Sequence, residues 1–222
     1  MTLWCKGDLQ HVSSVLLTRD TSVPASIMHA LVLNFCVNQL GEMMDILWLR
    51  AETSRNRRFP LFQNDDGEAS SQQLENVFER ISIKYVRNVA ELKALLLNVH
   101  LFPRPLPQCL IVDDLEYLCG SSAVQAYVEL AALGLEALSS TSPDSYKLIF
   151  VMGMNSPTAS TTQLRHFFQV RLGIAEADVK GKFMVASRPH GSLQPSYLTN
   201  KFRGLSATFE EHDSSTLKWC QS

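Results

Sequence analysis

The feature that most constrains the fold of this chain is an apolar run that ends in two carboxylates, QCLIVDD at residues 108–114. Four consecutive apolar residues without polar alternation predict a strand that is buried on both faces, as in a parallel sheet covered by helices. An acidic pair at the end of such a strand is typical of the edge at which α/β proteins bind nucleotides. The alternative is a central strand that ends in a solvated acidic turn.

Strand and helix patterns alternate along the rest of the chain. Strands are expected at residues 12–18, 43–49, 81–86, 109–113, 147–152 and 182–187. Helices are expected at residues 27–40, after Asn88, at residues 123–138 and at residues 163–172. Asn88 and Glu91 have the spacing of a capping box. Residues 206–211 and 217–220 indicate a hairpin, and the polar segment 50–71 is expected to be a mobile loop.

These patterns predict one domain over residues 1–222. Alternation of strands and helices favours an α/β fold with a mostly parallel sheet, helices on both of its faces and an antiparallel C-terminal edge. A chain of 222 residues buries roughly 70 percent of its unfolded surface on folding, so that neither a disulfide nor a metal is needed for stability.

A phosphate-binding P-loop should follow the first strand if the acidic pair serves ATP hydrolysis. That loop needs Gly, four residues, and then Gly-Lys-Ser/Thr. The eight equivalent positions, residues 18–25, read TRDTSVPA and contain none of the required residues. Val23 and Pro24 stand where the last glycine and the lysine belong, and Asp20 repels phosphate. The sequence therefore predicts no ATP or Mg²⁺ cofactor, and Asp113 and Asp114 are interpreted as a vestigial or structural nucleotide edge.

The distribution of charge predicts an anionic partner. Within a chain of net charge −2, residues 163–203 hold seven basic residues against two acidic ones, a local net charge of +5. The five cysteines are odd in number and form no Cys-x-x-Cys pair, which indicates reduced core thiols. Neither a signal peptide nor an apolar stretch of membrane-spanning length is present, so we expect an intracellular protein that does not contact a membrane.

Other chemistry has little support in the sequence. The six histidines show no zinc spacing with cysteines, and His29 on an apolar helix is expected to be a satisfied core residue. No serine lies in a Gly-x-Ser-x-Gly elbow, which argues against a hydrolase triad. The sequence thus predicts no catalytic residue and no metal site.

The forty residues from 78 to 118 carry a family resemblance. They include RISIKY at residues 80–85, Glu91-Leu92, Leu95-Leu96, His100, the proline-rich link before QCLIVDD, and LEYL at residues 115–118. This stretch resembles the RecA-fold partner of the SWIM-domain zinc-finger protein in metazoan Shu-type complexes, a diverged paralogue of the eukaryotic RecA-type recombinase. The resemblance extends over residues 12–190. It implies a RecA-like core, without room for the helical amino-terminal domain of full recombinases.

The resemblance also implies a function. Members of that family bind single-stranded DNA and assist recombinase filaments in homologous recombination, which implies a nuclear hetero-oligomer whose partners are the SWIM-domain protein and a RecA-type recombinase. The cytosol is the alternative location. Basic residues that follow the acidic strand are the expected DNA contacts: Arg165, Lys180, Lys182, Arg188, Lys201 and Arg203. A solvated basic face is the alternative reading of each of them.

Two other functions remain open from the sequence. The first is an ATP-independent RecA-like subunit of the Elongator type, because those chains also lack the P-loop and keep Val-Asp-Asp-Leu after an apolar strand, here at residues 112–115. The second is a weak, unorthodox NTPase. Neither reading changes the predicted fold.

Overall fold

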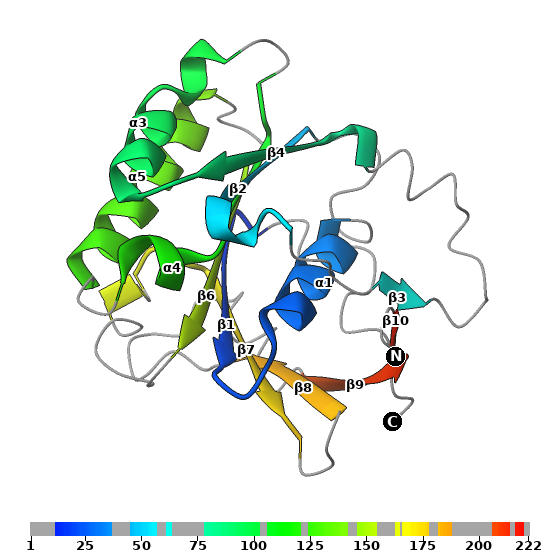
Figure 1. Cartoon of the computed structure of the whole chain (residues 1–222). Coiled ribbons are helices and arrows are strands. Elements are labelled where there is room, and N and C mark those ends of the chain that lie inside the picture. The colour runs from blue at the N-terminus through cyan, green and yellow to red at the C-terminus, as the bar shows by residue number, and fades with distance from the viewer. Residues whose placement is uncertain are drawn as a thin grey trace.

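The structure is a computed structural model, and its order of elements is drawn in Figure 1. It describes residues 12–36, 45–56, 61–63, 78–102, 106–120, 124–141, 146–154, 163–164, 166–177, 182–187, 206–213 and 216–219. These residues form a ten-stranded sheet with the order β3-β10-β9-β8-β7-β1-β6-β5-β2-β4.

Six strands form the parallel part of the sheet. In spatial order they are β7 (Val170–Glu176), β1 (Ser14–Asp20), β6 (Lys147–Met154), β5 (Cys109–Val112), β2 (Ile46–Ala51) and β4 (Ile81–Val86). β1, β2 and β5 are buried along nearly their whole length, which is why their sequences lack polar alternation. β4 lies at the end of the sheet, and in the described part of the chain its hydrogen-bonded neighbour is β2 alone.

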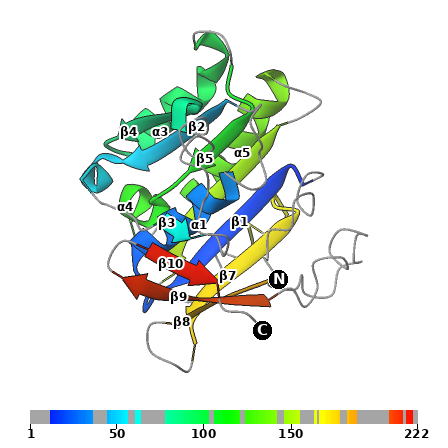
Figure 2. The same cartoon turned by 90° about the vertical axis from the view of Figure 1, so that its right-hand side faces the viewer.

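The C-terminal part of the sheet is antiparallel. β8 (Lys182–Ser187) pairs with β7, β9 (Ser206–Asp213) pairs with β8, and β10 (Thr216–Trp219) pairs with β9. The short strand β3 (Leu61–Gln63) then adds to β10 in parallel. Figure 2 shows these strands running on from β7 beside the parallel strands. The predicted antiparallel edge and tail hairpin are confirmed.

Helices cover both faces of the sheet, as predicted. α1 (Ala25–Phe35) lies on one face, and α3 (Val89–Leu97), α4 (Leu115–Cys119) and α5 (Val124–Thr141) lie on the other (Figure 1). Alternate residues of each central strand enter the two cores: Trp48 and Ile111 face α1, whereas Leu49 and Val112 face α5. α1 is buried from Ile27 to Phe35, which explains its nearly continuous apolar sequence.

The capping box before α3 is present in a shifted form. The Asn88 side chain accepts a hydrogen bond from the Glu91 amide at 2.9 Å, as the spacing predicts. The Glu91 carboxylate reaches one residue further back than usual and accepts from the Arg87 amide, also at 2.9 Å. The helix start was therefore predictable from two residues.

Two local predictions are wrong. Residues 163–172 were expected to form a helix, but Val170–Glu176 is strand β7, because pairing with β1 in the middle of the sheet overrides the local pattern. The segment 50–71 was expected to be one mobile loop. Arg50 and Ala51 instead end β2, Glu52–Ser54 is a 3₁₀ turn, and Leu61–Gln63 is β3, while residues 57–60 and 64–71 lie outside the described residues.

Candidate functional site

The turn between β1 and α1 is the position of a phosphate cradle in a nucleotide-binding α/β fold, and here it holds four residues, 21–24. The alignment with the P-loop pattern placed residues 18–25 in the loop. In the structure residues 18–20 belong to β1, and residue 25 begins α1. The Thr21 amide donates to the Asp20 carboxylate at 2.7 Å, and the Val23 amide donates to the Asp20 carbonyl at 3.0 Å. Pro24 has no amide proton. Two of the backbone donors of the turn are therefore used inside it, and Pro24 supplies none.

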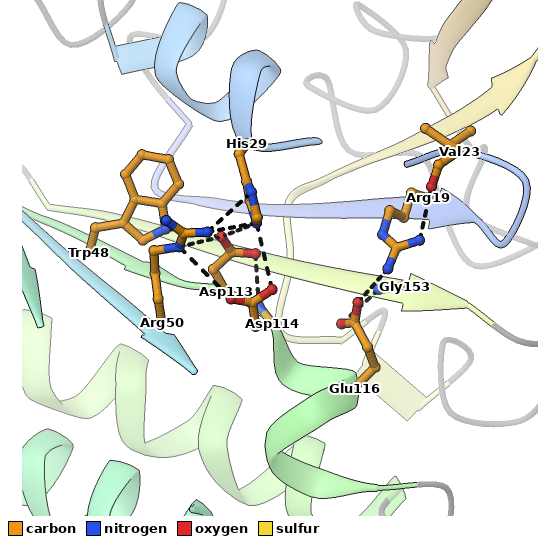
Figure 3. A network of polar contacts seen from close by, with 9 residues as sticks. All are labelled: Arg19, Val23, His29, Trp48, Arg50, Asp113, Asp114, Glu116 and Gly153. Atoms are coloured by element: carbon orange, nitrogen blue, oxygen red, sulfur yellow. Dashed lines mark hydrogen bonds and ion pairs between the residues drawn. The ribbon is translucent and has the colours of Figure 1, made fainter. Parts of the chain in front are cut away.

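An ion pair lies across the same edge of the sheet (Figure 3). Arg19, near the end of β1, donates through Nη1 to the Val23 carbonyl at 2.9 Å and through Nη2 to Glu116 Oε1 at 2.7 Å. Glu116 belongs to the first turn of α4, and its Oε2 accepts from the Gly153 amide on β6 at 3.0 Å. The two side chains are 12% and 19% exposed. They join β1, α4 and β6 at the place where a nucleotide would enter.

The acidic pair itself is buried in a polar cluster. We define the Asp113 cluster as His29 of α1, Trp48 and Arg50 of β2, and Asp113 and Asp114 after β5. Trp48 and Arg50 are two residues apart on one strand, so both side chains point toward α1. Figure 3 shows the His29 side chain extending from α1 toward the two carboxylates. None of the four ionisable side chains is more than 2% exposed.

Distances within the Asp113 cluster are short. Asp113 Oδ2 accepts from Trp48 Nε1 at 3.1 Å and lies 2.9 Å from His29 Nε2. Arg50 Nε lies 3.6 Å from Asp113 Oδ2 and 3.8 Å from Asp114 Oδ2. His29 Nε2 is 3.6 Å from Asp114 Oδ1. Each carboxylate therefore has a cationic or N–H group from two other elements within 4 Å, which offsets its negative charge inside the protein.

The backbone at Asp114 is left-handed, with φ 57° and ψ 30°. Few side chains adopt this conformation readily, and Asp and Asn are the common exceptions. The preceding carboxylate holds it in place, because Asp113 Oδ1 accepts from the Asp114 amide at 2.7 Å. The chain thus turns sharply from β5 into α4 and keeps both carboxylates under α1.

Three side chains at this edge are of the types that bind divalent cations. His29, Asp113 and Asp114 are residue types that bind metals, and their ligand atoms lie within 4.8 Å of one another. The guanidinium of Arg50 lies within ion-pair distance of both carboxylates. The residues do not fit a resident Mg²⁺, because the protein supplies its own positive charge there. A phosphate cradle beside it is also missing.

Electrostatics agree with an ion-paired cluster. Burial by itself would lower the pKa of His29, but the neighbouring carboxylates Asp113 and Asp114 outweigh it, and the pKa of His29 is raised. For Asp114, burial opposes ionisation, but the neighbouring His29, Ser54 and Arg50 outweigh it, and the pKa of Asp114 is lowered. Both groups are therefore stabilised in their charged forms.

The structure partly locates the residues predicted from the sequence. Asp113 and Asp114 lie together at the carboxyl end of β5, as expected. Of the six predicted DNA contacts, Lys182 begins β8 and is half-buried with interaction partners of its own. The other five lie outside the described residues: Arg165, Lys180, Arg188, Lys201 and Arg203. Phe168, near these basic residues in the sequence, is a core residue that is 2% exposed, and its ring centroid lies 5.2 Å from that of Phe150.

Sequence reasoning missed the partners of the acidic pair. His29 was correctly expected in the core, but its contact with Asp113 was not foreseen. Arg50 was assigned to a loop, and Arg19 was considered only as a failed P-loop position. The spacing Trp48-x-Arg50 at the end of an apolar strand was the available signal, since a buried arginine there requires carboxylates on the neighbouring strand.

Comparison with known proteins supports the fold. No protein-family model matches this sequence, and no curated protein sequence matches it. A crystal structure of the RadB recombinase has a similar fold, with a TM-score of 0.55 and 12% sequence identity, over 92% of this chain and 90% of that chain. Identity at this level defines the fold alone. The chain has a RecA-like α/β fold, as the sequence predicted.

Proposed function

We propose that this chain is a non-catalytic accessory factor of homologous recombination, a diverged recombinase paralogue that acts in the nucleus. One observation carries the proposal: the RecA-like core is intact, while its nucleotide edge is closed by the four-residue turn, the Arg19–Glu116 pair and the Asp113 cluster. A RecA-like core that lacks a phosphate site suits a protein that acts by binding other macromolecules and does not itself catalyse a reaction. The solved neighbour is a recombinase, which supports a role beside such enzymes.

The open edge of β4 supports the partner assignment. Ser82, Ile83 and Lys84 are exposed, and Ile83 retains 41% of its accessible surface. An edge strand with free hydrogen-bonding groups and an exposed apolar side chain is suited to pairing with a strand from another protein. We propose that the SWIM-domain zinc-finger protein or the RecA-type recombinase adds a strand here.

The predicted nucleic-acid contacts form the second half of the proposal. Arg165, Lys180, Lys182, Arg188, Lys201 and Arg203 belong to the basic segment of the chain. Contacts of this type with phosphates give sequence-independent binding to single-stranded DNA that weakens with salt, by about 0.7 in the log–log slope for each phosphate neutralised.

Affinity purification of the tagged full chain from cells of its own organism tests the partner. We expect a SWIM-domain zinc-finger protein and a RecA-type recombinase to co-purify, and the double substitution Ile83→Asp and Lys84→Glu to reduce both. The matched control is Leu97→Asp, which changes a side chain that is 58% exposed on α3. Recovery of Elongator subunits in their place would favour the alternative function.

A salt titration of single-stranded DNA binding tests the second half. Charge reversal of Lys180, Lys182 and Arg188 together should weaken binding and lower the salt slope by roughly 2. The control reverses three basic residues at the far end of the sheet, Arg55, Lys84 and Arg87, all exposed. Equal loss in both variants, or no loss in either, argues against the assigned DNA contacts.

Calorimetry with Mg-ATP tests whether the chain binds ATP, which catalysis would require. We expect no binding in the micromolar range, because the turn offers neither lysine nor a set of amides to phosphate. Micromolar binding that is lost in Asp113→Asn would support the NTPase alternative.

A further inference from the structure

His29 lies among three other ionisable side chains from two other elements. Asp113 and Asp114 follow β5, and Arg50 is the penultimate residue of β2. The carboxylates carry two negative charges, and Arg50 carries one positive charge. With a neutral imidazole, the cluster would hold a net charge of −1 in a region where each ionisable side chain is at most 2% exposed. An uncompensated buried charge costs several kcal/mol.

From this geometry we infer that His29 is held as an imidazolium, completing a charge-neutral buried quartet with Arg50, Asp113 and Asp114, so that the chain binds a proton when it folds. The inference is independent of the proposed function. It makes the packing of α1 against the carboxyl edge of the sheet dependent on pH.

The contacts of the ring support the charged form. Nε2 lies 2.9 Å from Asp113 Oδ2 and 3.6 Å from Asp114 Oδ1, within reach of both carboxylates. Arg50 Nη2 lies 3.2 Å from Nδ1 and 3.4 Å from Nε2. A guanidinium can only donate, so these two contacts oppose protonation of the ring, and the charged form rests on the two carboxylates.

Two further side chains of the described residues, Trp48 and Ser54, lie beside the quartet. β2 contributes Trp48, whose indole N–H donates to Asp113 and whose ring lies edge-on to His29 with centroids 6.2 Å apart. The 3₁₀ turn contributes the buried Ser54 side chain, which helps to lower the pKa of Asp114. The opposing effect is the positive charge of Arg50, which lowers the pKa of His29, but the two carboxylates exceed it and the pKa is raised.

The sign of the pH effect follows from linkage. A raised pKa in the folded state means that the stabilisation is complete below the unfolded pKa, near 6.5, and is lost as pH rises through the folded pKa. Between these two values, folding takes up as much as one proton from this site. The unfolding equilibrium constant should then rise by up to tenfold per pH unit.

Nitrogen-15 NMR of the histidine rings in the full chain tests the charge directly. The His29 ring is identified through its contact with the Trp48 indole. We expect both ring nitrogens to be protonated at pH 7, with the neutral form appearing only at higher pH. A single protonated nitrogen at pH 7 would overturn the inference, and this measurement does not depend on any variant being folded.

Urea unfolding of the wild type, His29→Gln and His100→Gln between pH 6 and 9 tests the linkage. His100 is exposed and provides the matched control. The stability difference between the wild type and His29→Gln should be largest at pH 6 and shrink toward pH 9, while His100→Gln follows the wild type. A difference that stays constant over this range contradicts the proposed proton uptake.

Discussion

The guanidinium of Arg19 and the carboxylate of Glu116, 97 positions apart in sequence, lie 2.7 Å apart and join the end of β1 to the first turn of α4. The pair is supported on both sides, because Arg19 also donates to the Val23 carbonyl and Glu116 also accepts from the Gly153 amide. This network closes the carboxyl edge of the sheet without a ligand.

A double-mutant cycle with Arg19→Met and Glu116→Gln measures this pair. We expect a coupling free energy of about 1 kcal/mol, because the pair is only partly exposed and hydrogen-bonded at both ends. Urea unfolding at pH 7 gives the four stabilities, and high salt should reduce the coupling. A coupling near zero would show that the two side chains contribute independently.

Gly153→Ala should destabilise the protein through the same pair. A Cβ at this position would lie 2.7 Å from Glu116 Oε1 and 2.9 Å from Arg19 Nη2, so the pair must move apart. The cost should be about 1 kcal/mol in the wild type and smaller when Arg19→Met and Glu116→Gln are already present. Equal costs in both backgrounds would place the strain elsewhere.

Removing one charge of the buried cluster should cost far more than removing a surface charge. Asp113→Asn removes the nearer of the two carboxylates that Arg50 and His29 share, and the expected loss of stability is about 3 kcal/mol. Glu52→Gln removes a carboxylate that is 47% exposed and serves as the control, with an expected change below about 0.5 kcal/mol. Thermal and urea unfolding should rank the two variants in this order.

The lowered pKa of Asp114 predicts how the stability of the protein falls in acid. Its pKa is lowered in the folded state, so its contribution is present above the unfolded value of 3.8 and is lost as pH falls through the folded value. Asp114→Asn keeps a residue that tolerates the left-handed backbone and removes the charge alone. The stability difference between wild type and Asp114→Asn should therefore shrink below pH 3.8, in unfolding titrations that extend to pH 2.

The three described cysteines should resist thiol reagents in the folded protein. Burial raises the pKa of Cys109 to about 12 and that of Cys119 to about 11, and it raises the pKa of Cys36 well above its usual value. Because the thiolate is the reactive form, labelling at pH 8 should be slow until the chain unfolds. Substituting Cys5 and Cys220 by serine restricts the readout to these three, and fast native labelling would contradict their burial.

The sequence predicted the sheet well where local pattern and burial coincide. Residues 109–112 are apolar because both faces of β5 are covered, and Asn88 with Glu91 marks the start of α3 on local chemistry alone. The failure at residues 170–172 has the opposite cause. That segment is short and mixed in polarity, and it becomes a strand because β1, some 155 residues earlier in the chain, offers it hydrogen bonds.

The Asp113 cluster shows why site chemistry was harder to predict than fold. Hydrophobic periodicity indicated that His29 is buried, but it does not report which polar group a buried side chain meets. His29 and Asp113 are brought together only by the packing of α1 on the sheet, and Arg50 joins them through the pairing of β2 with β5. The tertiary fold must be known before these partners can be named.

The turn of residues 21–24 sets a limit of length on any phosphate-binding loop at this place. A P-loop spans eight residues between strand and helix, and this connection has half that length. Exchanging side chains for glycine and lysine would leave too little backbone to wrap around a phosphate. A loop of P-loop length at this place would therefore require an insertion, and substitutions within residues 21–24 would not create one.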